Sequence, residues 1–171
     1  MSEHLPKVTY IIIGSKERLS RVKSYQIEKG AECLLCPFQS IEELPSFLDL
    51  KIAELDSSVI SLIPAGAFPK KDARVQLEHF SGSEFHFWGW YHFGNKFKGA
   101  AQSIGKINTL LNKVPQLEQG IFFSRPLYFS VGGLGDSGLN PFAELAKRFY
   151  LRLDPQNPLP SLTIRAKSLL H

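Results

Sequence analysis

Cysteine is scarce in this sequence, which has Cys33 and Cys36 alone among its 171 residues. Two cysteines cannot build the dense disulfide framework of small secreted proteins, so a hydrophobic core must hold the fold together. The pair has C-x-x-C spacing, but it lies in a predicted strand, Ala31 to Cys36, where residues three apart point to opposite faces. No second C-x-x-C or close histidine pair completes a zinc site. We therefore expect two buried structural thiols.

Long apolar runs and an excess of one charge are missing as well. No stretch approaches the roughly 20 apolar residues that a membrane-spanning helix needs, and the polar segment Met1 to Lys7 does not resemble a secretory leader. Lys and Arg number 20 against 16 Asp and Glu, and they are spread along the chain. Such a distribution is typical of a solvated surface and argues against nucleic-acid binding. We expect a cytoplasmic protein, or one peripheral to the inner membrane.

What is present, in the first third of the chain, is an alternation of apolar runs with helical patterns. Three apolar runs end at glycine or proline, as buried parallel strands do: Val8–Ile13, Ala31–Cys36 and Ser58–Ile63. Residues 16–29 and 41–55 carry apolar side chains at helical spacing, with Pro45 in the first turn of the second helix. This β-α-β-α-β order predicts a parallel sheet with right-handed crossovers.

Ligands of such sheets bind at the carboxyl ends of the strands. In this sequence those ends are the segments 14–15, 37–40 and 64–67. The candidate ligand-binding residues there are small or uncharged: Gly14, Ser15, Gln39, Ser40, Ala65 and Gly66.

The second half contains an aromatic segment, Glu84 to Phe93, whose alternation predicts a strand. One face would carry Phe85, Phe87, Tyr91 and Phe93, and the other His86, Trp88, Trp90 and His92. The two histidines lie too far apart to bind one metal ion together. The tryptophans could form an exposed platform for sugars or bases, but aromatic stripes are more often core, which we favour. Further patterns predict a helix over 98–112, a strand over 120–123, a helical turn over 126–131, a helix over 141–151 and an edge strand over 162–166.

A glycine-rich run, 132–135, fits neither a P-loop nor a dinucleotide fingerprint. Its first three residues, 132–134, end the stretch Gln119 to Leu134, which reads QGIFFSRPLYFSVGGL. This stretch contains a Gln, an apolar strand, an Arg, an amphipathic turn and Val-Gly-Gly. This stretch and the order of segments before it resemble the family-two inverting glycosyltransferases, in particular a short bacterial group often encoded beside radical-SAM proteins. Val59 to Pro69 is similar to the strand that carries the family's metal-binding Asp motif.

The resemblance implies an α/β fold of the GT-A type, like that of nucleotide-diphospho-sugar transferases, over most of the chain. It would be a mixed sheet whose parallel N-terminal half is flanked by helices. We expect a single domain over 1–171, with its N-terminal half at 8–69 and its C-terminal half at 84–166. The domain would be shortened, because the family has an additional strand and helix between the second and third strands.

Three acidic positions of the family carry other residues here. The Asp that holds the nucleotide base matches Pro37, and the metal-chelating Asp matches Ala65. A Glu-Asp pair that contains the catalytic base matches Pro141 and Phe142, with Glu144 as the nearest acid. A methyl group cannot ligate Mg²⁺ or Mn²⁺, which take oxygen ligands. Pro and Phe cannot accept a proton from an acceptor hydroxyl.

These losses favour a glycosyltransferase-like domain that no longer transfers sugar. It would bind a nucleotide, a nucleotide sugar or a protein partner. Gln119 and Arg125 remain as candidate ligand-binding residues, because they match the family's pattern. We expect no cofactor, and Mg²⁺ or Mn²⁺ only if the acidic motif lies elsewhere in the chain.

Two alternatives stay open. An active, metal-independent glycosyltransferase would use Lys70, Lys71 or Arg125 to offset the charge of the diphosphate, with Glu118 or Glu144 as the base. A homodimeric interaction module would instead use the aromatic strand, since aromatic residues are enriched at interface cores.

Overall fold

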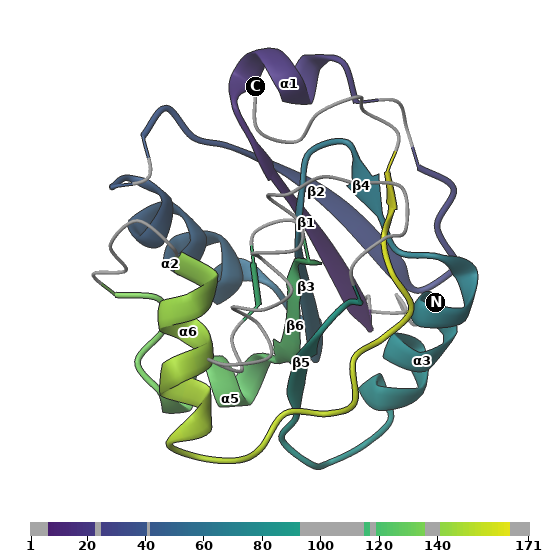
Figure 1. The fold of residues 1–171 in the computed structure, drawn as a ribbon, viewed down its shortest axis with the longest axis vertical. Helices are drawn as coiled ribbons and strands as arrows, with labels where there is room; N and C mark the ends of the chain where they lie inside the picture. Colours follow the sequence, from purple (N-terminus) through teal and green to yellow (C-terminus); the bar gives the residue numbers. More distant parts are fainter. Residues whose placement is uncertain are drawn as a thin grey trace, which may run out of the picture.

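The computed structural model describes residues 7–22, 25–40, 42–92, 115–116, 119–135 and 141–164. Their main sheet has five strands in the order β2-β1-β3-β6-β5 (Figure 1). These strands are β1 (Val8–Gly14), β2 (Ala31–Pro37), β3 (Val59–Pro64), β5 (Trp88–Trp90) and β6 (Ile121–Ser124). The first three run parallel, β6 is antiparallel to β3, and β5 is antiparallel to β6. The chain therefore has an α/β fold with a mixed sheet whose N-terminal half is parallel, as predicted.

Helices cover both faces of this sheet. Figure 1 shows α2 (Leu44–Glu54), α5 (Arg125–Ser130) and α6 (Pro141–Tyr150) on one side. On the other side lie α3 (Lys71–Ser81) and a two-stranded sheet of β4 (Ala67–Phe68) and β7 (Thr163–Ile164). The short helix α1 (Lys16–Ser20) follows the end of β1. No helix in the described ranges is long and apolar enough to cross a membrane.

The apolar run of β1 is continuous because both of its faces are buried. Ile11 and Ile13 belong to the core under α2, α5 and α6. Tyr10 and Ile12 belong to the core on the side of α3. A central parallel strand with two covered faces takes apolar residues on both faces, which explains the absence of alternation. Thr9, a polar exception, is buried and hydrogen-bonded.

The sequence predicted most of these elements, including α2 with Pro45 in its first turn, β6, α5 and α6. The helix predicted over 16–29 is too long, because α1 ends at Ser20. The residues after it include β-branched and aromatic side chains, which are weak helix formers. Tyr25 instead stacks on Phe68, with ring centroids 4.1 Å apart. The helix α3 was not predicted, and the helix over 98–112 lies outside the described residues.

The aromatic strand is shorter than predicted, but its alternation is confirmed. Within its described residues, 84–92, the strand is Trp88–Trp90. Trp88 and Trp90 face the core under α6, whereas Phe87 and Tyr91 face the opposite core. Both tryptophan side chains are buried. They therefore form neither an exposed platform for sugars or bases nor the surface of an aromatic dimer interface. The indole of Trp88 also donates to the Leu153 carbonyl at 2.9 Å.

The outer side of β5 is bonded by the chain's own later residues. Gln156 N–H donates to the Trp88 carbonyl at 2.7 Å, and Leu159 N–H donates to the Trp90 carbonyl at 2.9 Å. The predicted edge strand over 162–166 is not part of this main sheet. Of its described residues, 162–164, the last two form β7, which pairs with β4, while 165 and 166 lie outside the described ranges. The segment 156–159 thus protects this edge of the main sheet.

The two cysteines point to opposite faces of β2, as predicted. Cys36 is buried in the core under α2, and Cys33 packs partly against the opposite core. Loss of hydration on burial raises the pKa of each thiol to about 11. At neutral pH both are therefore protonated, which makes them poor nucleophiles and poor metal ligands.

This raised thiol pKa predicts a pH dependence of stability. In the unfolded chain a thiol ionises near pH 8.5, whereas Cys36 stays protonated until about pH 11 in the folded chain. Between these values the folded state binds more protons, so stability falls as pH rises, by up to about 1.4 kcal/mol per pH unit for this thiol. Urea unfolding at pH 8 and pH 10 measures the loss. Cys36→Ala should reduce the difference between the two pH values, and an equal difference in variant and parent would contradict the prediction.

Candidate functional site

The three predicted strand ends do come together at one edge of the sheet. Gly14 pairs with Pro37 of β2, and Ile13 pairs with Pro64 of β3. Beyond the strands, Ala65 N–H donates to the Ile13 carbonyl at 2.7 Å, and Phe38 N–H donates to the Gly14 carbonyl at 3.2 Å. We call this edge, with segments 14–15, 37–40 and 64–67, the carboxyl edge.

The residues of the carboxyl edge differ in how accessible they are. Ser15 is exposed and caps α1, since its hydroxyl accepts the Arg18 N–H at 3.3 Å. Gln39 is also exposed, and Ser40 is half-buried. Gly66 is half-buried with a positive φ of 87°, which suits a tight turn after β3. Hydroxyl and amide groups such as these can hydrogen-bond a ligand, but they carry no charge.

Ala65, which matches the metal-chelating Asp of the resembling family, is closed off from solvent. Its exposed fraction is 5%. Its methyl group packs so close to Gly14 that a Cβ placed on that glycine would lie 2.7 Å away. The position therefore has no room for a solvated carboxylate.

Carboxylates do follow the strand ends along the chain, but they are on the surface. Glu17 in α1 is exposed and pairs with Arg21. Glu42 and Glu43, which precede α2, are exposed. Within the described ranges, no group of three or more His, Cys, Asp or Glu side chains could hold a metal ion.

Gln119 lies near the carboxyl edge, but its side chain is used within the protein. Its exposed fraction is 2%. Its amide donates to the Tyr91 carbonyl at 3.1 Å and accepts the Gln116 N–H at 2.9 Å. These bonds join Gln119 to the end of β5. Glu118, the neighbouring candidate base, lies outside the described residues.

Arg125 does not reach the carboxyl edge. It follows Ser124, which pairs with Val59 at the opposite end of β3. Since a strand rises about 3.3 Å per residue, the length of β3 separates Arg125 from Pro64 by roughly 16 Å. Its guanidinium donates to the carbonyls of Ile52 and Ala53 at 3.1 and 3.0 Å, at the end of α2. A cation there stabilises the helix C-terminus, and the structure places this guanidinium away from the carboxyl edge.

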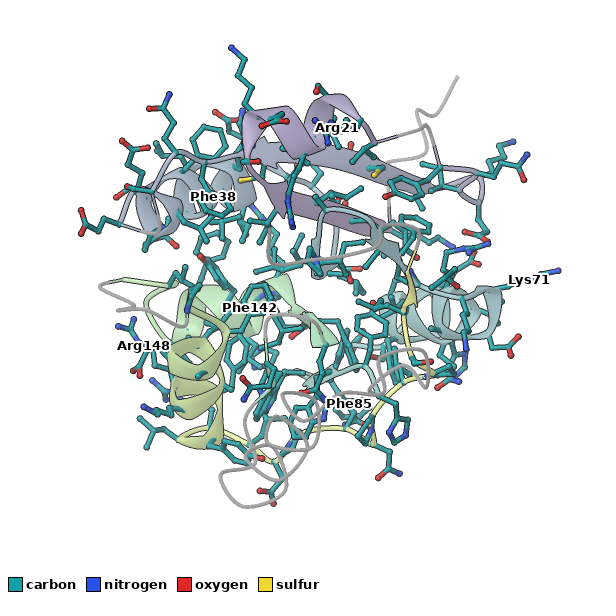
Figure 2. All side chains as sticks on the ribbon, turned by 45° about the horizontal axis from the view of Figure 1, so that its top comes forward. Arg21, Phe38, Lys71, Phe85, Phe142 and Arg148 are labelled. Atoms are coloured by element: carbon teal, nitrogen blue, oxygen red, sulfur yellow. The ribbon has the colours of Figure 1, made fainter. Side chains whose placement is uncertain are left out.

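The remaining candidate charges are on the surface. Glu144 in α6 pairs with Lys147 at 2.6 Å, with both side chains substantially exposed. Lys70 donates to the Ser161 hydroxyl at 3.2 Å, and Lys71 extends from α3 into solvent (Figure 2). Pro141 and Phe142, which the sequence resemblance aligns with an acidic pair, are both buried.

Sequence reasoning missed a polar network around Asp49. The carboxylate of Asp49, in the middle of α2, accepts the Tyr128 hydroxyl and the Leu134 N–H, the latter at 3.0 Å. Arg148 donates to the Gly133 carbonyl at 3.1 Å. Burial, together with the Asp49 carboxylate, raises the pKa of Tyr128 far above its ordinary value. The network fixes the Val-Gly-Gly-Leu segment against α2 and α6. The helical spacing over 41–55 gave no signal for it, because a single Asp between apolar residues is also typical of an exposed helix face.

A small cavity lies at the other end of the sheet. Its volume is about 10 Å³, and its lining includes Tyr10, Glu28 and Arg74. Arg74 pairs with Glu28 through Nε at 2.9 Å. A volume of this size holds at most one water molecule, so the cavity does not qualify as a substrate site.

The comparisons with known proteins add no assignment to this geometry. No protein-family model matches the chain, and no curated protein matches it.

Proposed function

We propose that this chain is a glycosyltransferase-like domain without catalysis, which uses the carboxyl edge to bind a ligand such as a nucleotide. The observation that carries the proposal is the chemistry of that edge. Segments 14–15, 37–40 and 64–67 meet there, and they offer hydroxyl, amide and backbone groups but no carboxylate. An edge of this kind can hydrogen-bond a ligand without supplying a metal site or a base.

Two buried positions support the loss of catalysis. Ala65 is enclosed against Gly14, and Phe142 is part of the core under α6. An inverting glycosyl transfer needs charge stabilisation at the leaving diphosphate and a base at the acceptor. Neither function can be supplied by a methyl group or a phenyl ring.

In the alternative of a metal-independent transferase, Arg125 was one of three cations expected to offset the charge of the diphosphate. Arg125 holds the end of α2 at the opposite edge. Lys70 and Lys71 begin a helix on the α3 side rather than forming a convergent pair with a base. No contact among the described residues favours this alternative over a binding role.

The proposal is tested by thermal unfolding with UDP, GDP, CDP and TDP, each with and without Mn²⁺. A ligand that binds the native state raises the midpoint by mass action. We expect a rise with one nucleotide that does not depend on Mn²⁺, and a loss of that rise in Gln39→Ala or Ser40→Ala. Val75→Ala, a change at an exposed residue of α3, is the matched control. No rise with any nucleotide would overturn nucleotide binding, and a Mn²⁺-dependent rise or sugar transfer would overturn the loss of catalysis.

A further inference from the structure

Tyr10 is a core tyrosine whose hydroxyl makes no hydrogen bond among the described residues, although its exposed fraction is 1%. The other tyrosines of the core do have partners. The Tyr91 hydroxyl shares a hydrogen bond with the Ser61 hydroxyl at 2.7 Å, and the Tyr128 hydroxyl donates to Asp49. Buried polar groups nearly always have a partner, which is either a protein group or an ordered water molecule. The hydroxyl of Tyr10 therefore requires one.

The side chain of Tyr10 lines the small cavity described above, between β1 and α3. The other polar side chains of the lining belong to Glu28, Lys29, Arg74 and Glu78. The cavity volume, about 10 Å³, is close to the smallest that holds a water molecule. Apolar cavities of proteins stay dry, whereas a water molecule enters a cavity that offers it two to four polar partners. This cavity has a polar lining of that kind.

A fixed acceptor lies in the same cavity. Nε of Arg74 donates to both carboxylate oxygens of Glu28, at 2.9 and 3.0 Å, and Nη1 donates to the Pro69 carbonyl at 2.9 Å. A carboxylate has about four acceptor positions, so Glu28 can accept further hydrogen bonds. Burial raises the pKa of Tyr10 far above its ordinary value, and the Glu28 carboxylate adds to the rise while Arg74 opposes it. The hydroxyl thus keeps its proton, and Glu28 is close enough to act on it.

We propose that this cavity binds one water molecule, which accepts the Tyr10 O–H and donates to the Glu28 carboxylate. Its second hydrogen is directed to Glu78, the other acidic side chain of the lining. Three hydrogen bonds are the usual number for a buried water molecule. The water would join three parts of the fold, namely β1, the connection 25–30 that precedes β2, and α3.

Charge and volume favour water over other occupants of the cavity. An anion would face the carboxylates of Glu28 and Glu78. A cation would face the guanidinium of Arg74, which already pairs with Glu28. An organic molecule is larger than the cavity. A neutral molecule that both accepts and donates hydrogen bonds matches a lining that contains a hydroxyl and carboxylates.

A crystal structure of the whole chain, at a resolution that shows ordered solvent, tests the proposal directly. We expect a water oxygen at about 2.5–3.0 Å from Oη of Tyr10 and from one carboxylate oxygen of Glu28. A cavity without solvent density would overturn the proposal. So would a direct hydrogen bond between Tyr10 and Glu28, because that bond would leave the hydroxyl no need of a water molecule.

Two variants extend the test to solution. Magnetic relaxation dispersion of the solvent counts the water molecules that are held inside a protein. We expect Tyr10→Phe to hold one fewer than the parent, because the phenyl ring offers the water no hydrogen-bond partner. Tyr91→Phe is the matched control and should leave the count unchanged, since the Tyr91 hydroxyl is bonded to Ser61. Equal counts in Tyr10→Phe and the parent would contradict the proposal.

Thermal unfolding checks that both variants are folded. If Tyr10→Phe does not fold, the crystal structure of the parent still decides between a bound water molecule and a dry cavity. None of these outcomes depends on nucleotide binding, because the cavity lies at the end of the sheet opposite the carboxyl edge.

Discussion

Gly133→Ala is expected to destabilise the fold by roughly 2–4 kcal/mol, from backbone strain together with loss of the Asp49 bonds. Gly133 has a φ of +71°, which a residue with a Cβ rarely adopts. A Cβ at this position would also lie 2.6 Å from Oδ1 of Asp49. Asp49 could move away only by giving up its bonds to Tyr128 and Leu134. Chemical denaturation of variant and parent measures the difference in free energy of unfolding.

The neighbouring glycine provides the control. Gly132 has a φ of +80°, but a Cβ there would meet nothing within 4 Å. Gly132→Ala should therefore cost only the backbone strain, about 1–2 kcal/mol. In an Asp49→Ala background, part of the cost of Gly133→Ala should disappear, because the clashing oxygen is gone. Equal costs at the two glycines would show that the network around Asp49 contributes little.

Ala65→Asp is expected to lower stability by roughly 3 kcal/mol or more at neutral pH, since it places a carboxylate at a buried site. This change introduces the residue type that the proposed resemblance to glycosyltransferases implies at this position. Ala65 is enclosed and packs against Gly14, so the new carboxyl group would be poorly hydrated. We therefore expect destabilisation rather than a restored metal site. Thermal unfolding with and without Mn²⁺ distinguishes these two results.

The pH dependence of this variant identifies the cause. Burial raises the pKa of a carboxyl group in the folded state above its unfolded value near 3.9. The deficit relative to the parent should therefore be smallest near pH 4 and should grow as pH rises towards 7. Ser15→Asp is the control, because Ser15 is an exposed helix cap and Asp is equally favourable there. A deficit independent of pH would mean that steric crowding, not charge, is responsible.

The parallel half of the sheet could be predicted because its signals are local. Each of β1, β2 and β3 is a short apolar run that ends at glycine or proline, and such runs specify buried strands without long-range information. Parallel strands end at the same edge of a sheet, and the pairing of Gly14 with Pro37 and of Ile13 with Pro64 brings these ends together. For this reason the carboxyl edge could be placed from sequence before any contact was known.

Contacts between distant residues could not be predicted in the same way. In the sequence, Asp49 lies between apolar residues of α2 and resembles an ordinary surface acid. Its hydrogen-bond partners, Tyr128 and Leu134, are 79 and 85 residues further along the chain. Arg125 matches a family position that was interpreted as phosphate-binding, yet the antiparallel direction of β6 places it at the far edge. The helix α1 ends at Ser20, and Tyr25 stacks on Phe68, a contact between distant residues that helical spacing does not reveal.

The segment that bonds β5 has a consequence for synthesis on the ribosome. Residues 156–159 follow all five strands of the main sheet in the chain, and a nascent chain emerges from its N-terminus. The parallel strands can therefore begin to assemble while the outer side of β5 is still uncovered, beside Trp88 and Trp90. A ribosome that pauses before Gln156 is translated would hold a chain with two aromatic residues next to an open strand edge.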